Sequence, residues 1–281
     1  MHHWFACRSA VLVLVLGGCT PLKPPGDHSP LVPPRMSPDS VVVDIFFVRF
    51  PFGDDEANGP LWDEVDEQHF PTELRRELDA GGFRAGAVGC QMPVTLSKLL
   101  ELSDKPPPTE QVVETSLEDL DSTPTVVRRH KQLRAGKPCE IQASGVYEEL
   151  PVVMCRDGQL CGRSYENAQA VLVLKAFPEA DGRVRLEIVP EVHHGQQRKR
   201  FVGSHGALRM DVGRARRVFD ELTLSARLSV GQMIVLSSLE SRPGSLGHHF
   251  FTRDNGSRER QLIVVRLAQT QHQSMFSPES D

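Results

Sequence analysis

The feature of this chain that most constrains its fold is the regular alternation of apolar and polar side chains in the C-terminal half. The clearest case is the segment 184–192 (VRLEIVPEV), most of whose apolar residues fall on one face of an extended strand. Four other segments have the composition of strands and are separated by turn residues: 170–177, 222–230, 232–239 and 261–268. Period-two patterning of this kind is typical of an antiparallel sheet that buries one face. We therefore expect residues 123–270 to fold as an antiparallel β-rich domain.

A second pattern, upstream of this region, predicts helices as well as strands. Segment 41–50 (VVVDIFFVRF) is apolar at nearly every position, which predicts a strand covered on both faces. A helix is predicted to begin near Pro71 and to end at Gly81-Gly82, because proline suits the first helical position and glycine the left-handed stop. A further strand over 83–90 and a short helix after it complete a β-α-β-α order. We expect a small N-terminal β-α-β-α module over 41–103 and, with the β-rich domain, an α+β fold.

The N-terminus has the features of an export signal. A seven-residue apolar run, 10–16, is too short to span a bilayer, which takes about 20 residues, and is typical of the core of a signal peptide. The sequence Leu-Gly-Gly-Cys that ends at Cys19 resembles the lipobox of bacterial lipoproteins, in which cleavage precedes a cysteine that then carries the lipid. The resemblance implies a signal peptide over 1–18, lipidation at Cys19 and, because Thr20 follows, a place at the periplasmic face of the outer membrane. An ordinary signal peptide that happens to contain Cys19 is the alternative.

Proline-rich segments separate the predicted parts of the chain. Residues 20–39 contain seven prolines, which favour an extended conformation, so we expect a tether over 19–40. Three consecutive prolines in 103–110 predict a boundary, followed by a linker over 104–122. Residues 271–281 are predicted to be a disordered tail.

The order of the predicted strands resembles the secretin domain, the channel-forming module of bacterial outer-membrane secretion and pilus systems. Four parts carry the resemblance, in order: a proline-led strand, turn and strand (123–141), a central hairpin (170–192), a strand-Gly-Gln-strand hairpin (222–239), and a Leu-Gly-x-x-Phe turn with a final strand (245–251 and 259–269). The resemblance implies a structural component that assembles into a ring or binds other components of a secretion system.

The chain also departs from the secretin pattern. Ser237 and Ser238 stand where the family usually has glycines, and only one upstream module would fit in the chain. The predicted strands are short for a lipid-facing barrel, which takes about 9–11 residues a strand. We therefore expect a secretin-derived accessory or ring protein rather than a self-sufficient channel.

The sequence lacks the common motifs of catalysis and cofactor binding. It contains no nucleophile elbow, phosphate-binding loop, zinc-protease motif, EF-hand loop or dinucleotide motif, so we expect neither enzyme activity nor a cofactor. A formal net charge of −5 argues against a nucleic-acid partner. Two histidine pairs, His193-His194 (beside Glu191) and His248-His249, are interpreted as solvated turn residues and not as metal ligands. Acidic residues within 63–67 are interpreted as a solvated helix face.

Two cysteines suit an exported protein. Cys155 and Cys161 flank Asp157-Gly158, which predicts a tight turn, and a three-residue loop would place them opposite each other in a hairpin. A disulfide between them is then possible in an oxidising compartment, with two free thiols as the alternative.

A basic stretch interrupts this mildly acidic chain between two predicted hairpins. It contains Arg198, Lys199, Arg200, Arg214, Arg216 and Arg217. Such a stretch is suited to contact with anionic lipid headgroups or acidic partner loops, and the alternative is a solvated loop.

These observations lead to one functional hypothesis and one alternative. The chain is predicted to be a lipid-anchored envelope protein with a secretin-like domain, a structural component or accessory of a secretion or pilus assembly at the outer membrane. The alternative is a monomeric envelope lipoprotein with a β-rich binding domain and no secretion role.

Overall fold

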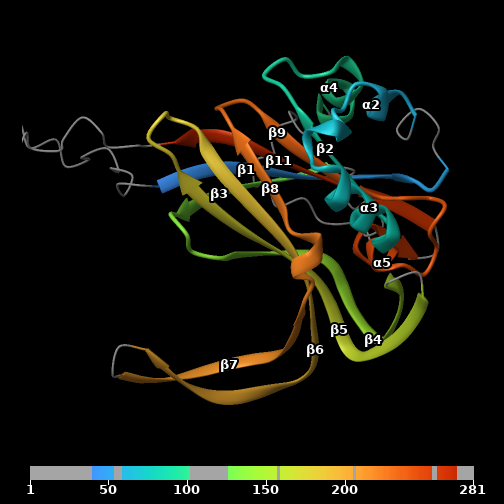
Figure 1. Cartoon of the computed structure of the whole chain (residues 1–281), viewed down its shortest axis with the longest axis vertical. Helices are drawn as coiled ribbons and strands as arrows, with labels where there is room; N and C mark the ends of the chain where they lie inside the picture. Colours follow the sequence, from blue (N-terminus) through green and yellow to red (C-terminus); the bar gives the residue numbers. More distant parts are fainter. Residues whose placement is uncertain are drawn as a thin grey trace, which may run out of the picture. The chain divides into compact units, whose positions relative to one another are not determined.

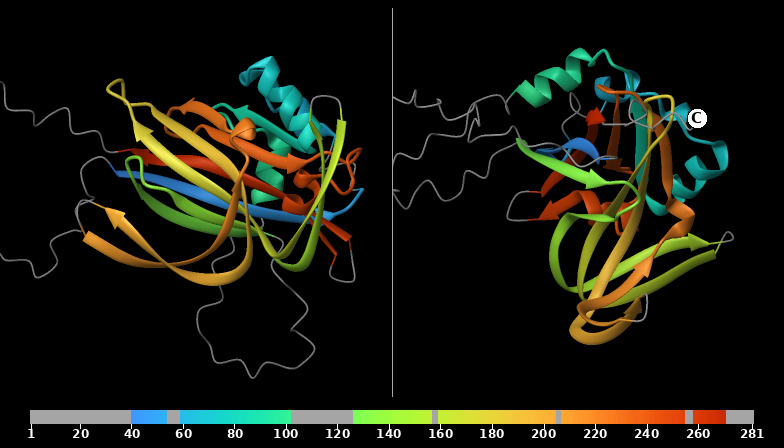
Figure 2. Two further views of the ribbon diagram at one scale, coloured as in Figure 1. Left: turned by 60° about the horizontal axis from the view of Figure 1, so that its bottom comes forward. Right: turned by 90° about the vertical axis from the view of Figure 1, so that its left-hand side faces the viewer.

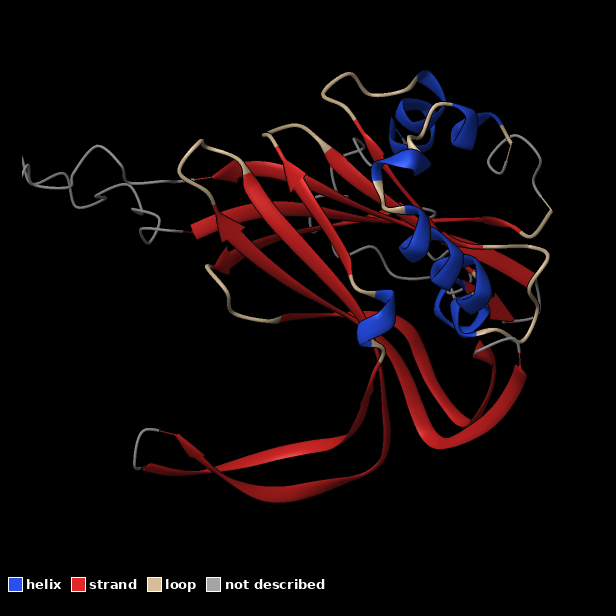
Figure 3. Ribbon diagram, viewed as in Figure 1, coloured by secondary structure: helices blue, strands red, loops and turns tan. Residues whose placement is uncertain are grey.

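The computed structural model describes residues 40–53, 59–101, 126–156, 159–204, 207–254 and 258–270. Two antiparallel β-sheets make up most of them, with a few short helices (Figure 3). Among these residues the helices are all too short or too polar to span a bilayer. The predicted signal peptide, Cys19, the linker, the C-terminal tail and all but the last residue of the tether lie outside the described part of the chain.

The first sheet has the strand order β2-β9-β11-β1-β3 (Figure 1). Its strands are β1 (Ser40–Pro51), β2 (Phe83–Val88), β3 (Val126–Arg134), β9 (Met233–Ser238) and β11 (Arg258–Thr270), and β10 (Thr252–Asp254) pairs with β11. Strand β1 is buried along most of its length, as its composition predicts. Ile45 and Phe47 pack into the core shared with the second sheet, whereas Phe46 and Val48 pack against helical residues on the other face.

The second sheet has the strand order β4-β5-β6-β7, and β8 also pairs with β6. Its strands are β4 (Cys139–Arg156), β5 (Gln159–Pro178), β6 (Val184–Ser204), β7 (Ala207–Val218) and β8 (Leu224–Leu228). The predicted alternation is confirmed, because Val184, Leu186 and Ile188 are all fully buried. The predicted central hairpin is confirmed as well, since β5 and β6 pair from Pro178 and Val184 onward.

The helices are short and flank the first sheet. They are α2 (Pro60–Asp63), α3 (Thr72–Gly81), α4 (Val94–Glu101) and α5 (Leu246–Phe251), with the 3-10 turns η1 (Glu67–His69) and η3 (Asp220–Leu222). The predicted helix after Pro71 is confirmed as α3, which ends at Gly82 with a left-handed φ of 78°. The Leu-Gly-x-x-Phe segment is not a simple turn: it forms α5, where Ser245 caps the N-terminus by accepting a hydrogen bond from the His248 amide.

The boundary expected between an N-terminal module and a C-terminal domain is wrong. Strands β1 and β2 do not pair with each other; β1 lies between β11 and β3, and β2 pairs with β9. All described residues fall in one compact unit, Met36–Asp281. The physical reason is that β1 is apolar on both faces, so a small module could not have covered it. The α+β, β-rich fold class itself is confirmed.

The predicted hairpin over 222–239 is also wrong, because its two strands belong to different sheets. Strand β8 pairs with β6, whereas β9 pairs with β11 and β2. Between them the chain pairs with β11: Gly231 N donates to Leu267 O (2.8 Å) and Leu267 N donates to Gln232 O (3.0 Å). The chain likewise passes from the first sheet to the second between β3 and β4 (Figure 2). Side chains from both sheets form one apolar core.

Candidate interaction surfaces

Two β-hairpins of the second sheet extend beyond the region in which β5 and β6 pair with each other. Arm 1 consists of residues 146–168, where β5 pairs with β4 alone among the described strands. Arm 2 consists of residues 198–213, where β6 pairs with β7 alone among them. The arms run in different directions (Figures 1 and 2). Arm 2 is therefore a two-stranded ribbon, an arrangement that is only marginally stable in water without a further partner. Arm 1 has a further contact along β4, because Val153 N donates to Gly244 O (3.2 Å) and Val153 forms a parallel bridge with Ser245.

Each arm begins at an irregularity in the pairing. In β4 the register shifts between Gln142 and Val146, and the Ser144 hydroxyl accepts a hydrogen bond from the Ala170 amide (3.0 Å). In β6 the register shifts between His194 and Arg198, beside Gly195 with a φ of 74°. Bulges increase local twist and bend a strand, so these positions set the direction of the arms.

The predicted basic stretch lies on the strands of arm 2 and at its base, not on a loop. Arg198 and Lys199 are exposed on β6, and the side chain of Arg200 lies outside the described part of the structure. The other three contact the protein itself: Arg214 donates to Asn167 O (3.3 Å), Arg216 pairs with Glu140 (3.2 Å), and the Arg217 guanidinium lies over the Phe219 ring. The structure thus does not present the six residues as one continuous exposed patch.

The expected placement of the two cysteines is wrong. The register pairs Met154 with Cys161 and Cys155 with Leu160, so the two cysteines do not lie directly opposite each other. The side chain of Cys155 lies outside the described part of the structure. Cys161 is an exposed free thiol.

Neither histidine pair is a solvated turn. His193 lies in β6 with its side chain 12% exposed, and its Nε2 is 2.9 Å from Oε2 of Glu191. His194 stacks on Tyr165, and burial lowers its pKa, as do Arg163 and His193. The described residues include no cluster of three or more side chains suited to hold a metal ion.

In the acidic segment, Glu67 pairs with Arg84 (2.6 Å), while Asp63 and Glu64 are exposed.

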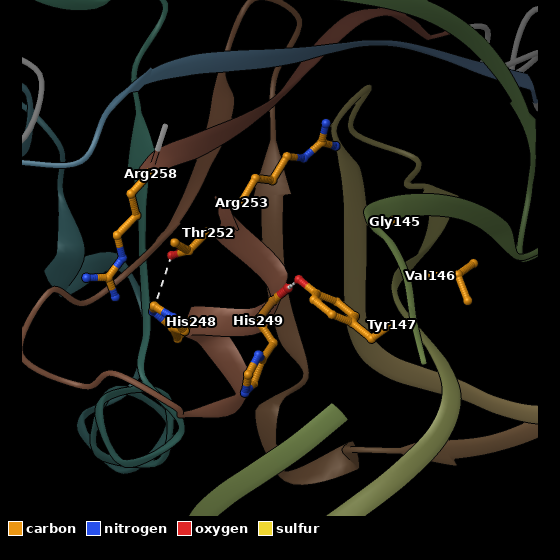
Figure 4. Close-up of a pocket in the computed structure, with 8 residues that line it drawn as sticks. All are labelled: Gly145, Val146, Tyr147, His248, His249, Thr252, Arg253 and Arg258. Carbon is orange, nitrogen blue, oxygen red and sulfur yellow. Dashed lines mark hydrogen bonds between the residues drawn. The ribbon is translucent and has the colours of Figure 1, made fainter. Parts of the chain in front are cut away.

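A cavity of about 580 Å³ lies where arm 1 meets the first sheet (Figure 4). It is lined by Gly145, Val146, Tyr147, His248, His249, Thr252, Arg253 and Arg258. Tyr147 donates to His249 O (3.0 Å), and His249 Nε2 is 2.7 Å from Pro151 O. These contacts fix the base of arm 1 to α5.

Burial and positive charge dominate the electrostatics of the cavity. Burial lowers the pKa of His248 to about 4, with further contributions from His249, Arg258 and Arg260. Burial also lowers the pKa of His249 and raises that of Tyr147. Both imidazoles are therefore neutral at pH 7. The sequence analysis singles out only the histidine pair of this cavity, because the lining residues Gly145, Val146 and Tyr147 lie about a hundred residues earlier in the chain, on β4.

Comparisons with known proteins give little to identify the chain. No protein-family model and no curated protein sequence matches it. It has a weak structural likeness to the InvG secretin domain β-barrel from the Salmonella SPI-1 injectisome, with 13% identity and a TM-score of 0.17. The alignment covers 81% of this chain and 59% of that chain, so the present chain spans about three fifths of the length of that protein. A likeness of this strength does not establish a shared fold.

Proposed function

We propose that this protein is a lipid-anchored envelope protein that serves as a structural component or accessory of a protein secretion or pilus assembly at the outer membrane. The lipid at Cys19 would hold it at the periplasmic face, and its β-structure would pair with further copies or with other components of the assembly. No catalytic role is part of this proposal.

The observation that carries the proposal is arm 2, a hairpin that consists of two described strands. Arm 2 pairs with no other described strand, and Arg198 and Lys199 on it are exposed. A two-stranded ribbon leaves both outer edges open, and such edges are either protected or used for pairing with another chain. Lateral pairing with a neighbouring copy would extend arm 2 into a wider sheet. The secretin-like order of the sequence segments supports the same role.

The oligomeric state in membrane extracts tests this function. The full-length chain, extracted in mild detergent, should run as a discrete multimer in native gels and form rings in electron micrographs. A variant in which a two-residue Asn-Gly turn replaces residues 198–213 keeps the rest of β6 and β7 and should yield monomers. Monomers from the unaltered chain would refute the assembly role.

The same membrane extracts also test whether a lipid at Cys19 anchors the protein. Cys19→Ser should move the protein from the membrane fraction to the soluble envelope fraction, whereas Cys161→Ser, at an exposed free thiol, should leave it in the membrane fraction. Membrane retention of the Cys19→Ser protein would contradict lipid attachment at that residue.

A second function, a monomeric envelope lipoprotein with a binding domain, is favoured by the cavity at the base of arm 1. Its volume of about 580 Å³ lies in the range of small-molecule sites, about 300–1,000 Å³. Monomeric extracts would support this alternative.

A further inference from the structure

Strand β3 forms an open edge of the first sheet. Among the described strands it pairs with β1 alone, along all nine of its residues. The side chains of residues 128–132, in the middle of the strand, are all exposed, so the strand is accessible there. An open edge presents backbone donors and acceptors to one further strand, and native proteins either protect such an edge or use it.

The exposed side chains of β3 are mostly basic, and their contacts differ between its two faces. On one face, Arg128 and His130 both contact Asp44. Arg129 and Lys131 lie on the other face, and no ion pair between described residues involves either of them. This second face therefore has two positive charges, on alternate residues, without a carboxylate partner in the described part of the chain.

A cavity of about 270 Å³ lies beside this second face, between the first sheet and β4. Its apolar lining is buried and consists of Ile45, Phe47 and Ile141. Arg129 and Lys131 line it as well. The acidic residue of the lining, Glu140 on β4, pairs instead with an arginine of β7 (3.2 Å). The edge of β3 thus borders a cavity with an apolar floor and a positive rim.

The positive charge near Arg129 extends beyond this cavity. Burial lowers the pKa of Arg253, and the charges of Arg49 and Arg129 lower it further. Tyr147 and Glu259 have the opposite effect on the pKa of Arg253. Three guanidinium groups are therefore close enough to repel one another, which favours a negatively charged binding partner on this side of β3.

We propose that the open edge of β3 binds an extended acidic segment of a partner protein, which adds to the first sheet as a further strand. In this mode of recognition, main-chain hydrogen bonds supply the affinity and alternate side chains supply the specificity. Basic residues protect an edge against basic and apolar strands, whereas opposite charges on paired strands stabilise the pairing. Strand β3 belongs to the first sheet and arm 2 to the second, so this proposal and the assembly role can fail separately.

The residues of β3 predict the sequence pattern of the bound segment. Its acidic residues should stand two positions apart, opposite Arg129 and Lys131. Apolar residues should flank them, opposite Val127 and Leu133, which lie on the same face of β3 and pack in the core. The peptide TVTETETVT has this pattern and the length of β3. It reads the same from both ends, so it fits β3 in a parallel or an antiparallel direction.

Titration of the purified full-length chain with this peptide, capped at both ends, tests the proposal. Binding should saturate, and hydrogen exchange should show new protection of backbone amides in β3. Arg129→Gln and Lys131→Gln should each weaken binding about threefold, because each removes one pair of opposite charges. Both side chains are exposed, so the fold should persist, and Arg76→Gln, at an exposed arginine of α3, is the matched control. Absence of saturation, or protection confined to other strands, would overturn the proposal.

A second peptide separates strand pairing from simple attraction between charges. In TVTEPETPT, prolines replace one threonine and one valine that point to opposite faces, so at least one of the lost amide donors faces β3. Both glutamates remain. This peptide should bind about tenfold more weakly or worse, the usual result of losing hydrogen bonds to the sheet. Equal binding of the two peptides would show that charge alone attracts them, which contradicts strand addition.

The acidic residues of the chain itself allow a last test. Five of them stand shortly before β3 in the sequence: Glu110, Glu114, Glu118, Asp119 and Asp121. Replacing all five with the corresponding amides should leave the affinity for TVTETETVT unchanged. Binding that becomes about tenfold tighter would show that this stretch competes for β3, and it would overturn the assignment to a separate partner.

Discussion

Asp44 is a carboxylate in the middle of β1, where the surrounding side chains are apolar. Its side chain is only 3% exposed, and its two oxygens lie 2.9 Å from Arg128 Nη2 and from His130 Nδ1 on the neighbouring edge strand β3. Burial raises the pKa of Asp44, but the hydrogen bonds and positive charges of His130 and Arg128 outweigh it, so the pKa lies below its ordinary value of 3.8. The ionised carboxylate therefore stabilises the pairing of β3 with β1.

Replacing this carboxylate with an amide should weaken the fold in a pH-dependent way. Asp44→Asn should lower the free energy of unfolding by about 2 kcal/mol at pH 7, because hydrogen bonds to a charged group are lost. A lowered pKa means that the unfolded chain takes up a proton first as the pH falls, so the wild type loses this stabilisation below about pH 4. Urea unfolding of both proteins between pH 7 and pH 3 measures the difference, which should shrink at the acidic end.

Asp63→Asn is the control for this experiment. Asp63 is exposed, so its substitution should change stability by no more than about 0.5 kcal/mol at any pH. A difference between wild type and Asp44→Asn that stays constant down to pH 3 would contradict the role given to the carboxylate.

Helices α3 and α5 approach each other closely at a pair of glycines. Gly82 ends α3, and Gly247 lies in the first turn of α5. A Cβ atom on Gly247 would lie 2.1 Å from Gly82 O and 2.8 Å from Phe83 N, which are backbone atoms that cannot move aside. The same carbonyl of Gly82 accepts a hydrogen bond from Leu239 N (2.9 Å), so this junction joins α3, β2, β9 and α5.

Gly247→Ala should force α5 away from this junction. We expect a loss of about 2 kcal/mol in the free energy of unfolding, the usual cost of overpacking a filled interior. Gly162→Ala on arm 1 is the control, because a Cβ there meets no atom within 4 Å. Thermal unfolding of the two variants measures the effect, and equal melting temperatures would refute the close approach.

The sequence patterns predict where the strands lie better than they predict which strands pair with each other. The alternation over 222–230 correctly placed Leu224, Ala226 and Leu228 on the buried face of β8. It could not predict that β8 and β9 belong to different sheets, because a period of two fixes the face of each residue and not the strand beside it. The cavity is not predicted by the sequence for a related reason: Tyr147 of β4 reaches His248 and Arg253 only through the packing of β4 against α5 and β10.

The two halves of the chain share one set of sheets. The N-terminal strand β1 pairs with β11 over nearly its whole length on one side and with β3 on the other. Strand β2 likewise completes the other edge of the sheet beside β9. Strand β11 therefore depends on β1 for its hydrogen-bonding partners on one side, and the first sheet is complete only when both strands are present.

A fragment of residues 123–270, the region that the sequence alone marks as a domain, should therefore not fold by itself. Strand β1 contributes eight buried apolar side chains. At about 1.5–3 kcal/mol for each, their loss would be comparable to or larger than the total stability of a typical domain, about 5–15 kcal/mol. Circular dichroism and amide NMR should show no cooperative unfolding and little chemical-shift dispersion for the fragment, whereas residues 36–281 should give a cooperative transition. A well-dispersed spectrum from the fragment would mean that the second sheet and the remainder of the first are stable without β1, and that β1 only adds to a fold that is already complete.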